Sequence, residues 1–317
     1  MFPLFRMSRT PTPSSRPLQA LRPVAMAALL GLAASAQAHM SWILPNTSHA
    51  DGKEATISVD ASVSEDLFNF ERALKLETLT ITGPDGKPRE AENRNTARHR
   101  DSFDLKLVQD GTYRISHFSQ SVMASYRAGS ETKRFRGSAE AFAKEVPASA
   151  EVLSMALASN RQQTFVSKED AGQASFTPEG QGLEVLPLGP VTDLSTGDTT
   201  RLRLLFNGKP LPGATLKLLR DGNRYRYKLG ELPLSSDAQG EVSIRWPEAG
   251  RYYLGVSHGN RPPAPTPAPA PGASAAAPAA PAMAGAPGAM PPGMTGGTRE
   301  QPLQRASLSV TFEVLPR

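Results

Sequence analysis

The 317-residue sequence has no cysteine, few aromatic residues and, after its first 38 residues, no apolar run of membrane-spanning length. Without cysteine, the chain has no disulfide scaffold, no thiolate zinc site and no cysteine nucleophile. The patterns HExxH, GxSxG and GxGxxG and the P-loop are missing as well. No motif of a known catalytic class therefore supports an enzyme, and no enzymatic activity is expected.

The formal charge of +5 does not indicate nucleic-acid binding. Residues 1–38 contain four of the 35 basic residues and no acidic residue. The remaining 31 basic residues oppose 30 acidic ones, which leaves a net charge of +1. A nearly neutral chain lacks the basic footprint of a DNA- or RNA-binding protein, so no nucleic-acid partner is expected.

Residues 1–38 have the pattern of a cleavable secretory signal peptide. A basic segment precedes a short apolar run, Val24–Leu32, and the small residues AASAQA follow. This pattern predicts export, with the periplasm as the expected compartment and no integral membrane segment after cleavage. Two cleavage sites compete, one leaving Gln37 first and the other leaving His39 first.

His39 is a candidate metal ligand because of that second cleavage site. A histidine at position one offers its α-amine and its imidazole Nδ1 to the same ion, as a chelate. Such nitrogen donors suit nickel, cobalt, copper, zinc or iron. The alternative is that His39 is simply the residue after a processing site.

The body of the chain is predicted to be all-β. Short runs of alternating apolar and polar residues recur with Gly- and Pro-containing turns between them. The expected architecture is two immunoglobulin-like or transthyretin-like antiparallel sandwiches, over residues 39–172 and 183–317, joined by a linker at 173–182. The runs lie at residues 55–63, 74–82, 102–107, 112–118, 163–167, 183–186, 200–206, 214–220, 225–229, 241–246, 251–258 and 308–315.

Two segments depart from the strand pattern. Residues 138–160 have helical composition in two pieces, 138–146 and 152–158, with Ser138 as the expected cap. Residues 261–300 form a low-complexity insert rich in proline, alanine and glycine, which predicts a disordered loop within the second sandwich. The insert is either a tolerated loop extension or an arm that reaches a wall, a membrane or a partner.

Four further residues are candidate metal ligands. His117 shares a strand face with Tyr113 and Ile115, which fits a structural histidine or a ligand. His49 follows His39 closely enough to fold back on it. The pair Glu65 and Asp66 lies beside an apolar anchor and offers oxygen ligands, or belongs to a solvated loop.

One aromatic segment has two interpretations. Tyr225-Arg226-Tyr227 is typical of a surface that stacks on a sugar or a base. A cross-strand ladder of aromatic side chains explains the same residues more simply.

Several segments along the chain resemble one family. They include HMSWILP at 39–45, DASVSEDLFNF at 60–70, LETLTITGPDG at 76–86, GLEVLPL at 182–188 and FNGKPLPG at 206–213, with SSDAQGEVSI and EAGRYYLGVSH further on. Together they are similar to the DUF4198 family. The resemblance implies a periplasmic binding protein of two β-sandwich units, often linked to nickel or cobalt uptake and in some cases to iron acquisition. It also implies His39 as the metal-bearing position and inner-membrane metal transport or reductase components as partners.

Two hypotheses follow. In the first, the protein is a periplasmic accessory of metal uptake that binds a divalent transition metal ion through His39, with His117 or His49 and an oxygen of Glu65 or Asp66. In the second, it is a non-catalytic adhesion or carbohydrate- or protein-binding sandwich. A third hypothesis, a copper-dependent oxidase, is supported by His39 alone.

Overall fold

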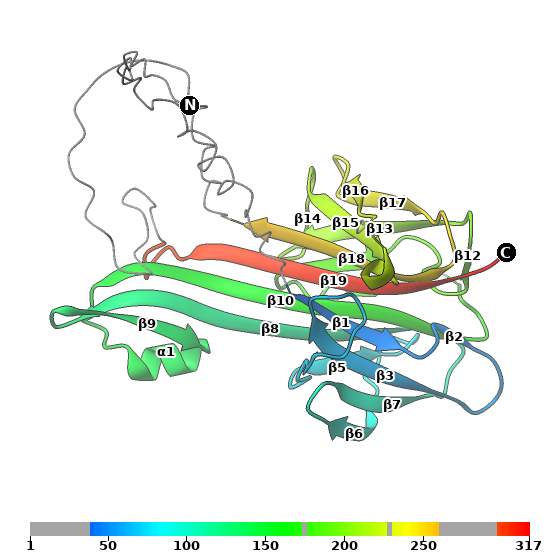
Figure 1. Ribbon diagram of the computed structural model, residues 1–317, viewed down its shortest axis with the longest axis horizontal. Helices are drawn as coiled ribbons and strands as arrows, with labels where there is room; N and C mark the ends of the chain where they lie inside the picture. The colour runs from blue at the N-terminus through cyan, green and yellow to red at the C-terminus, as the bar shows by residue number, and fades with distance from the viewer. Residues whose placement is uncertain (1–38, 173–175, 227–229, 260–296) are drawn as a thin grey trace, which may run out of the picture. The chain divides into compact units, whose positions relative to one another are not determined.

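The computed structural model describes residues 39–172, 176–226, 230–259 and 297–317 (Figure 1). The predicted signal peptide lies outside the described residues, and so does the predicted Pro/Ala insert as far as residue 296. Residues 39–317 form one compact unit, and the regular structure of its described residues is mostly β-strands in three sheets. Within the described residues, no helix is long and apolar enough to span a membrane.

Sheet A is built from the first part of the chain. The strand that begins at Ala55 alternates as predicted: Ala55, Ile57 and Val59 are buried, and the residues between them are more exposed. The sheet order is β1 (Met40–Pro45), β3 (Ala55–Ser64), β7 (Asp101–Leu107) and β6 (Glu92–Thr96), with β4 (Arg72–Ala73) paired to β3.

Sheet B takes strands from both halves of the chain. Its main order is β16 (Leu232–Ser235), β15 (Thr215–Arg220), β18 (Gly250–Gly259), β19 (Leu303–Leu315), β10 (Val152–Lys168), β8 (Gly111–Ala128) and β5 (Leu79–Thr82). Three short or peripheral strands join it: β2 (His49–Ala50) on β10, β9 (Glu131–Gly137) on β8 and β12 (Leu194–Ser195) on β19. Most pairs are antiparallel as predicted, but β19, β2 and β12 make parallel pairs that the sequence did not indicate.

Sheet C belongs to the second half of the chain. It contains β11 (Leu183–Pro187), β13 (Thr199–Phe206), β14 (Lys209–Pro210) and β17 (Glu241–Arg245). Its apolar residues, such as Leu202 and Ile244, pack with sheet B into the larger core around Trp246. Sheet A packs with sheet B into a second core that contains Ile57 and Tyr113.

Strand β10 connects the two cores because neighbouring residues of a strand point to opposite faces. Phe165 belongs to the core shared with sheet C, and Val166 belongs to the core shared with sheet A. The all-β sandwich class is therefore confirmed, with one sheet common to both sandwiches. The division into domains at 173–182 stays a prediction.

Of the two predicted helical pieces, the first is confirmed and the second is not. Helix α1 spans Ala139–Glu145, and the Ser138 hydroxyl accepts the Ala141 N–H at 3.1 Å, as expected of the cap. The second predicted piece, 152–158, is wrong, because these residues begin strand β10. They pair with β8 on one side and β19 on the other, so tertiary pairing overrides their helical composition.

The extensions of β8 and β10 form an arm with β9 and α1, seen at the far end of these strands in Figure 1. A separate small core fills it, including Val122, Phe142 and Met155. Phe142 packs edge-on against Phe135 with ring centroids 5.2 Å apart. The helix therefore covers the arm rather than either main sandwich.

Candidate functional site

The first described residue, His39, lies at the open end of sheet A. It directly precedes β1, and its side chain is exposed. Strand β1 pairs antiparallel with β3, with Met40 opposite Ser64. The pairing ends there, and the residues that follow it outward on the two chains, His39 and Glu65, are both exposed. Directly opposed residues of antiparallel strands have Cβ atoms about 4.5–5.5 Å apart, which is within reach of one shared ion.

Glu65 begins a short loop, Glu65–Glu71, which we call the rim loop. The Glu71 carboxylate accepts the backbone N–H groups of Glu65 and Asp66 at 3.1 and 3.4 Å. The His99 ring Nδ1 lies 2.8 Å from the Glu71 carbonyl oxygen. These bonds fix the backbone of the rim loop next to His39.

The other predicted oxygen ligand points to a different partner. Asp66 Oδ2 lies 3.8 Å from Arg224 Nε, in the second half of the chain. A cation already faces this carboxylate, so the geometry favours Glu65 over Asp66 as an oxygen ligand next to His39.

His49 lies at the opposite end of β1 from His39. Six residues of strand span about 20 Å. Its Nδ1 is 2.8 Å from Ser167 Oγ, and its Nε2 is 3.1 Å from Asp51 Oδ1. The structure therefore does not bring His49 to His39, and both of its ring nitrogens already have partners.

His117 is buried on β8, opposite Gln162 of β10. Its Nδ1 lies 3.1 Å from Thr78 Oγ1, and burial lowers the pKa of the imidazole. Gln162 donates in turn to Ser41 Oγ of β1 at 2.9 Å. His117 thus belongs to the polar end of the core between sheets A and B, below the surface on which His39 is exposed.

No cluster of three or more His, Asp or Glu residues suited to a metal ion occurs in the described ranges. An N-terminal histidine needs fewer neighbouring ligands, because it supplies two metal donors, the α-amine and the imidazole. With Glu65, two residues would provide three donors.

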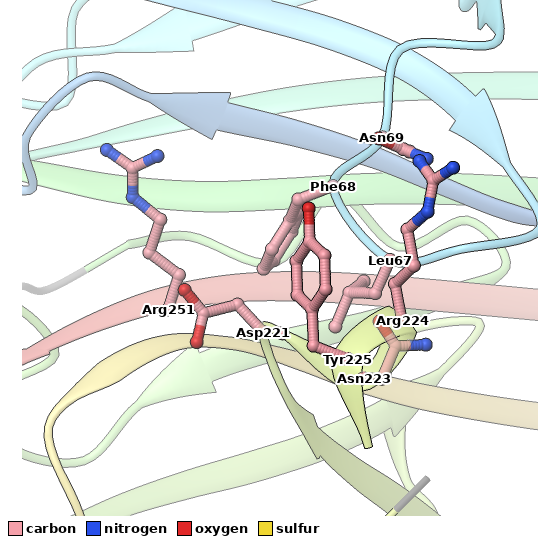
Figure 2. Close-up of a pocket in the computed structure, with 9 residues that line it drawn as sticks. Leu67, Phe68, Asn69, Asp221, Asn223, Arg224, Tyr225 and Arg251 are labelled. Carbon is pink, nitrogen blue, oxygen red and sulfur yellow. The ribbon is translucent and has the colours of Figure 1, made fainter. Parts of the chain in front are cut away.

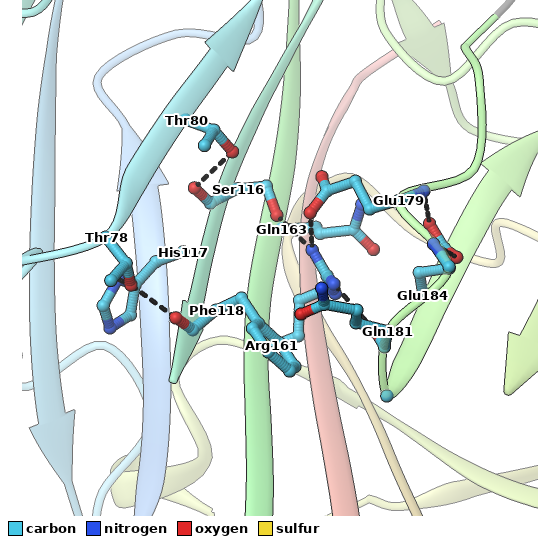
Figure 3. A network of polar contacts seen from close by, with 12 residues as sticks. Thr78, Thr80, Ser116, His117, Phe118, Arg161, Gln163, Glu179, Gln181 and Glu184 are labelled. Carbon is cyan, nitrogen blue, oxygen red and sulfur yellow. Dashed lines mark hydrogen bonds and ion pairs between the residues drawn. The ribbon is translucent and has the colours of Figure 1, made fainter. Parts of the chain in front are cut away.

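A buried charge network lies on the other face of β8 and β10 (Figure 3). The Arg161 guanidinium, 1% exposed, donates to the carbonyl oxygens of Leu183 and Gln181 at 2.9 Å each and to the Glu179 carboxylate. Arg161 also lies over the Phe118 ring, 4.6 Å from its centroid.

The same network includes Arg114 and the Glu184 carboxylate. Glu184 accepts the N–H groups of Glu179 and Gly180 at 2.8 and 2.9 Å, and Arg114 lies 3.4 Å from Glu179. Burial lowers the pKa of Arg114. Two cations and two anions balance here. The contacts of Arg161 and Arg114 fasten residues 176–184 to sheet B, and those of Glu184 hold residues 179–184 to one another. The network therefore has a structural role.

A small cavity opens beside the rim loop (Figure 2). It lies between Phe68 of that loop and Tyr225 of the turn after β15, and its volume is about 210 Å³.

The sequence predicted a strand at 225–229, but Tyr225 ends a 3-10 turn, η1 (Asn223–Tyr225). The ladder interpretation of Tyr225 is therefore wrong, because this side chain is 86% exposed.

The solved structures with similar folds are distant. A DUF4785 family protein from Legionella pneumophila has a TM-score of 0.20 and 11% identity, over 68% of this chain and 50% of that one. Escherichia coli alpha-2-macroglobulin activated by porcine elastase has a TM-score of 0.20 and 14% identity, over 70% of this chain and 18% of that one. The chain thus spans half the length of the first and less than a fifth of the second.

The D0-D1 domain of Intimin has a TM-score of 0.18 and 13% identity, over 68% of this chain and 88% of that one. No curated protein matches the chain. The family described as "Domain of unknown function (DUF4198)" matches residues 36–260, well over half of the sequence. The chain therefore belongs to the DUF4198 family.

Proposed function

We propose that this protein is an exported, non-catalytic binding protein that holds a divalent transition metal ion at His39 as an accessory of metal uptake. The observation that supports this most is the register of β1 on β3, which ends at Met40 opposite Ser64, one residue from each of the exposed His39 and Glu65. The compact unit also begins at His39, the residue that the second cleavage site would leave first.

The donor set of this site fits nickel, cobalt, copper or iron in their divalent states. The His39 amine and imidazole are nitrogen donors, and the Glu65 carboxylate adds an oxygen. Three donors leave coordination positions open, which suits an ion that is handed on to an inner-membrane transport or reductase component. The amine and imidazole must be deprotonated to bind, so affinity should fall as the pH drops through the histidine range.

The test is a titration of the exported chain with nickel, cobalt, copper and zinc by isothermal calorimetry. We expect His39→Ala to weaken the affinity for the tightest-binding metal by roughly 10–100-fold or more. Loss of a residue that only supports a metal ligand already costs that much. Glu65→Gln should weaken it less. A variant with one extra alanine before His39 keeps the imidazole but has its free α-amine on the added alanine. It should also bind the metal less tightly.

His258→Ala is the matched control, because His258 is an exposed histidine on β18 whose ring packs against Phe206 of sheet C, away from the rim loop. It should leave binding unchanged. Binding that is indifferent to His39→Ala, or that is lost equally in His258→Ala, would contradict the proposal. The second function, an adhesion or carbohydrate- or protein-binding sandwich, would then stand alone.

A further inference from the structure

The cavity beside the rim loop has the features of a separate ligand site. In Figure 2 the rings of Phe68 and Tyr225 face one another across it, with Arg224 and Arg251 on its two sides. Neither arginine nor Tyr225 belongs to the proposed metal site. The volume of about 210 Å³ is below the roughly 300–1,000 Å³ typical of pockets for drug-sized ligands. It suits a single small ring.

The Phe68 wall is fixed in an unusual conformation. Phe68 has a φ of 61°, in the left-handed region that bulky side chains rarely adopt. Its ring packs edge-on against the buried Trp42, with centroids 5.5 Å apart. Such backbone strain persists where the surroundings hold it in place, and it is frequent at binding sites.

The turn that carries Tyr225, on the other side of the cavity, is also held in one conformation. Gly222 has a φ of 72°, which a glycine adopts at no steric cost, and the Tyr225 N–H donates to its carbonyl at 3.0 Å. The Arg226 guanidinium donates to the carbonyl oxygens of Arg220 and Asp221 at 2.8 and 2.7 Å. The turn thus presents Tyr225 to solvent on a fixed backbone.

A buried polar atom at the cavity has no partner. Asn223 lines the cavity and is 5% exposed, and its side-chain oxygen has no hydrogen-bond partner among the described residues. Buried side-chain oxygens in folded proteins are normally hydrogen-bonded. This oxygen is closed off from the cavity, so a ligand hydroxyl would reach it only after the turn Asn223–Tyr225 shifts.

The charges around the cavity favour an anion with hydroxyl groups. Arg224 and Arg251 approach their nearest carboxylates, Asp66 and Glu313, only at 3.8 Å each. The Arg251 guanidinium also donates to the Asn46 carbonyl oxygen at 3.1 Å, so Arg224 keeps more of its donors for a ligand. A carboxylate matches the guanidinium fork. Asp221 also lines the cavity and is a further acceptor for hydroxyl groups.

We propose that this cavity binds one carboxylated pyranose ring of an anionic polysaccharide. The apolar C–H face of the ring stacks on Tyr225, and the sugar carboxylate pairs with Arg224 or Arg251. Ring hydroxyl groups donate to Asp221. A peptide with a free carboxylate would match the arginines, but it would leave the paired aromatic walls and the hydroxyl acceptor Asp221 without a role.

The test compares a tetramer of galacturonic acid with a neutral galactose tetramer, titrated into the exported chain by calorimetry. We expect the acidic tetramer to bind at least about tenfold more tightly, because a charge-assisted hydrogen bond contributes roughly 1.5–3 kcal/mol. Arg224→Gln should remove most of that preference. Tyr225→Ala should weaken both tetramers by up to about tenfold, through the lost ring contact.

Two controls separate the site from general effects. Arg127→Gln removes a similarly exposed arginine on the arm, and Val108→Ala trims an exposed apolar side chain, so neither should change binding. His39→Ala should leave sugar binding intact, which separates this proposal from the metal site. Equal affinity for the acidic and neutral tetramers, insensitivity to Tyr225→Ala, or tighter binding of a tetrapeptide carboxylate would overturn the proposal.

Discussion

The two tryptophans of the chain have the same local chemistry but hold different parts of the molecule. Both are fully buried, and each indole N–H donates to a hydroxyl group. Trp246 donates to Thr200 Oγ1 at 2.9 Å and packs with Tyr252 and Phe312 inside the larger core. Trp42 donates to Ser64 Oγ at 3.0 Å, but its ring contacts are Phe68 and Phe70 of the rim loop.

This difference shows how one residue type serves stability in one region and site geometry in another. Trp246 joins sheets B and C, so its contacts disappear only when that sandwich unfolds. Trp42 fastens the loop that carries Glu65, Phe68 and Asn69 to the first strand. The proposed metal and sugar sites both depend on this loop.

The largest expected effect comes from removing the two indoles. Trp246→Ala should lower the free energy of unfolding by about 3–5 kcal/mol, the usual cost of a buried aromatic side chain. Trp42→Ala should instead show its main effect in the rim loop, as faster amide hydrogen exchange at 65–71. Denaturant unfolding and hydrogen-exchange mass spectrometry measure the two. Equal global destabilisation with no local change in the loop would contradict the comparison.

A similar loss is expected where the chain crosses from one sandwich to the other. Arg161→Met leaves the Glu179 carboxylate without its main partner, and breaking a buried ion pair typically costs about 3–5 kcal/mol. Arg127→Met removes an exposed arginine paired with Glu151 on the arm, which should cost about 0–1 kcal/mol. Thermal unfolding of both variants tests this contrast. A small effect of Arg161→Met would show that residues 176–184 are not held by the network.

The hydroxyl groups that accept the indole protons allow a finer test. Thr200→Val and Ser64→Ala each leave a buried indole N–H without an acceptor, at a cost of about 1–3 kcal/mol. We expect Thr200→Val to lower the unfolding midpoint, and Ser64→Ala to reduce binding at the rim as well. In a Trp42→Phe background, which has no indole N–H, Ser64→Ala should cost clearly less than it does in the natural chain. If Ser64→Ala costs the same in both backgrounds, the hydrogen bond is not the cause.

The smallest expected effect is a pH dependence in the core between sheets A and B. Burial lowers the pKa of His117 in the folded state below its unfolded value near 6.5. Below about pH 6.5, His117 binds a proton more readily in the unfolded chain than in the folded chain. The free energy of unfolding should therefore fall as the pH drops from about 6.5. Glu77, Asp101, Arg161 and Arg94 all influence this imidazole. His117→Gln should flatten the decrease, measured by urea unfolding between pH 5 and 7.5.

Much of the fold could be predicted from local patterns. Alternation gave the position of β3, and turn residues marked the ends of β13 and β15. The sequence did not indicate β1, because HMSWILP does not alternate and becomes a strand by pairing with β3. It also did not indicate the parallel pairing of β10 with β19, which joins residues about 147 positions apart.

The candidate sites were predictable only in part. His39 and Glu65 were named from their residue types, but the pairing of Met40 with Ser64, which ends next to both, depends on a strand register that no local pattern specifies. Tyr225 was named as a stacking residue within a strand that is in fact a turn. Phe68, Asn223 and Arg251 come together only in the tertiary structure. The Asp221-Gly222 turn signal was the one local clue to that loop.

The most direct test of the proposed function is the intact mass of the chain recovered from a bacterial periplasm without any N-terminal tag. Cleavage after Ala38 would leave His39 first, with its free amine beside Glu65, and this is the mass that we predict. A mass that begins at Gln37 would place the amine two residues away from the imidazole and contradict the two-donor metal site at His39.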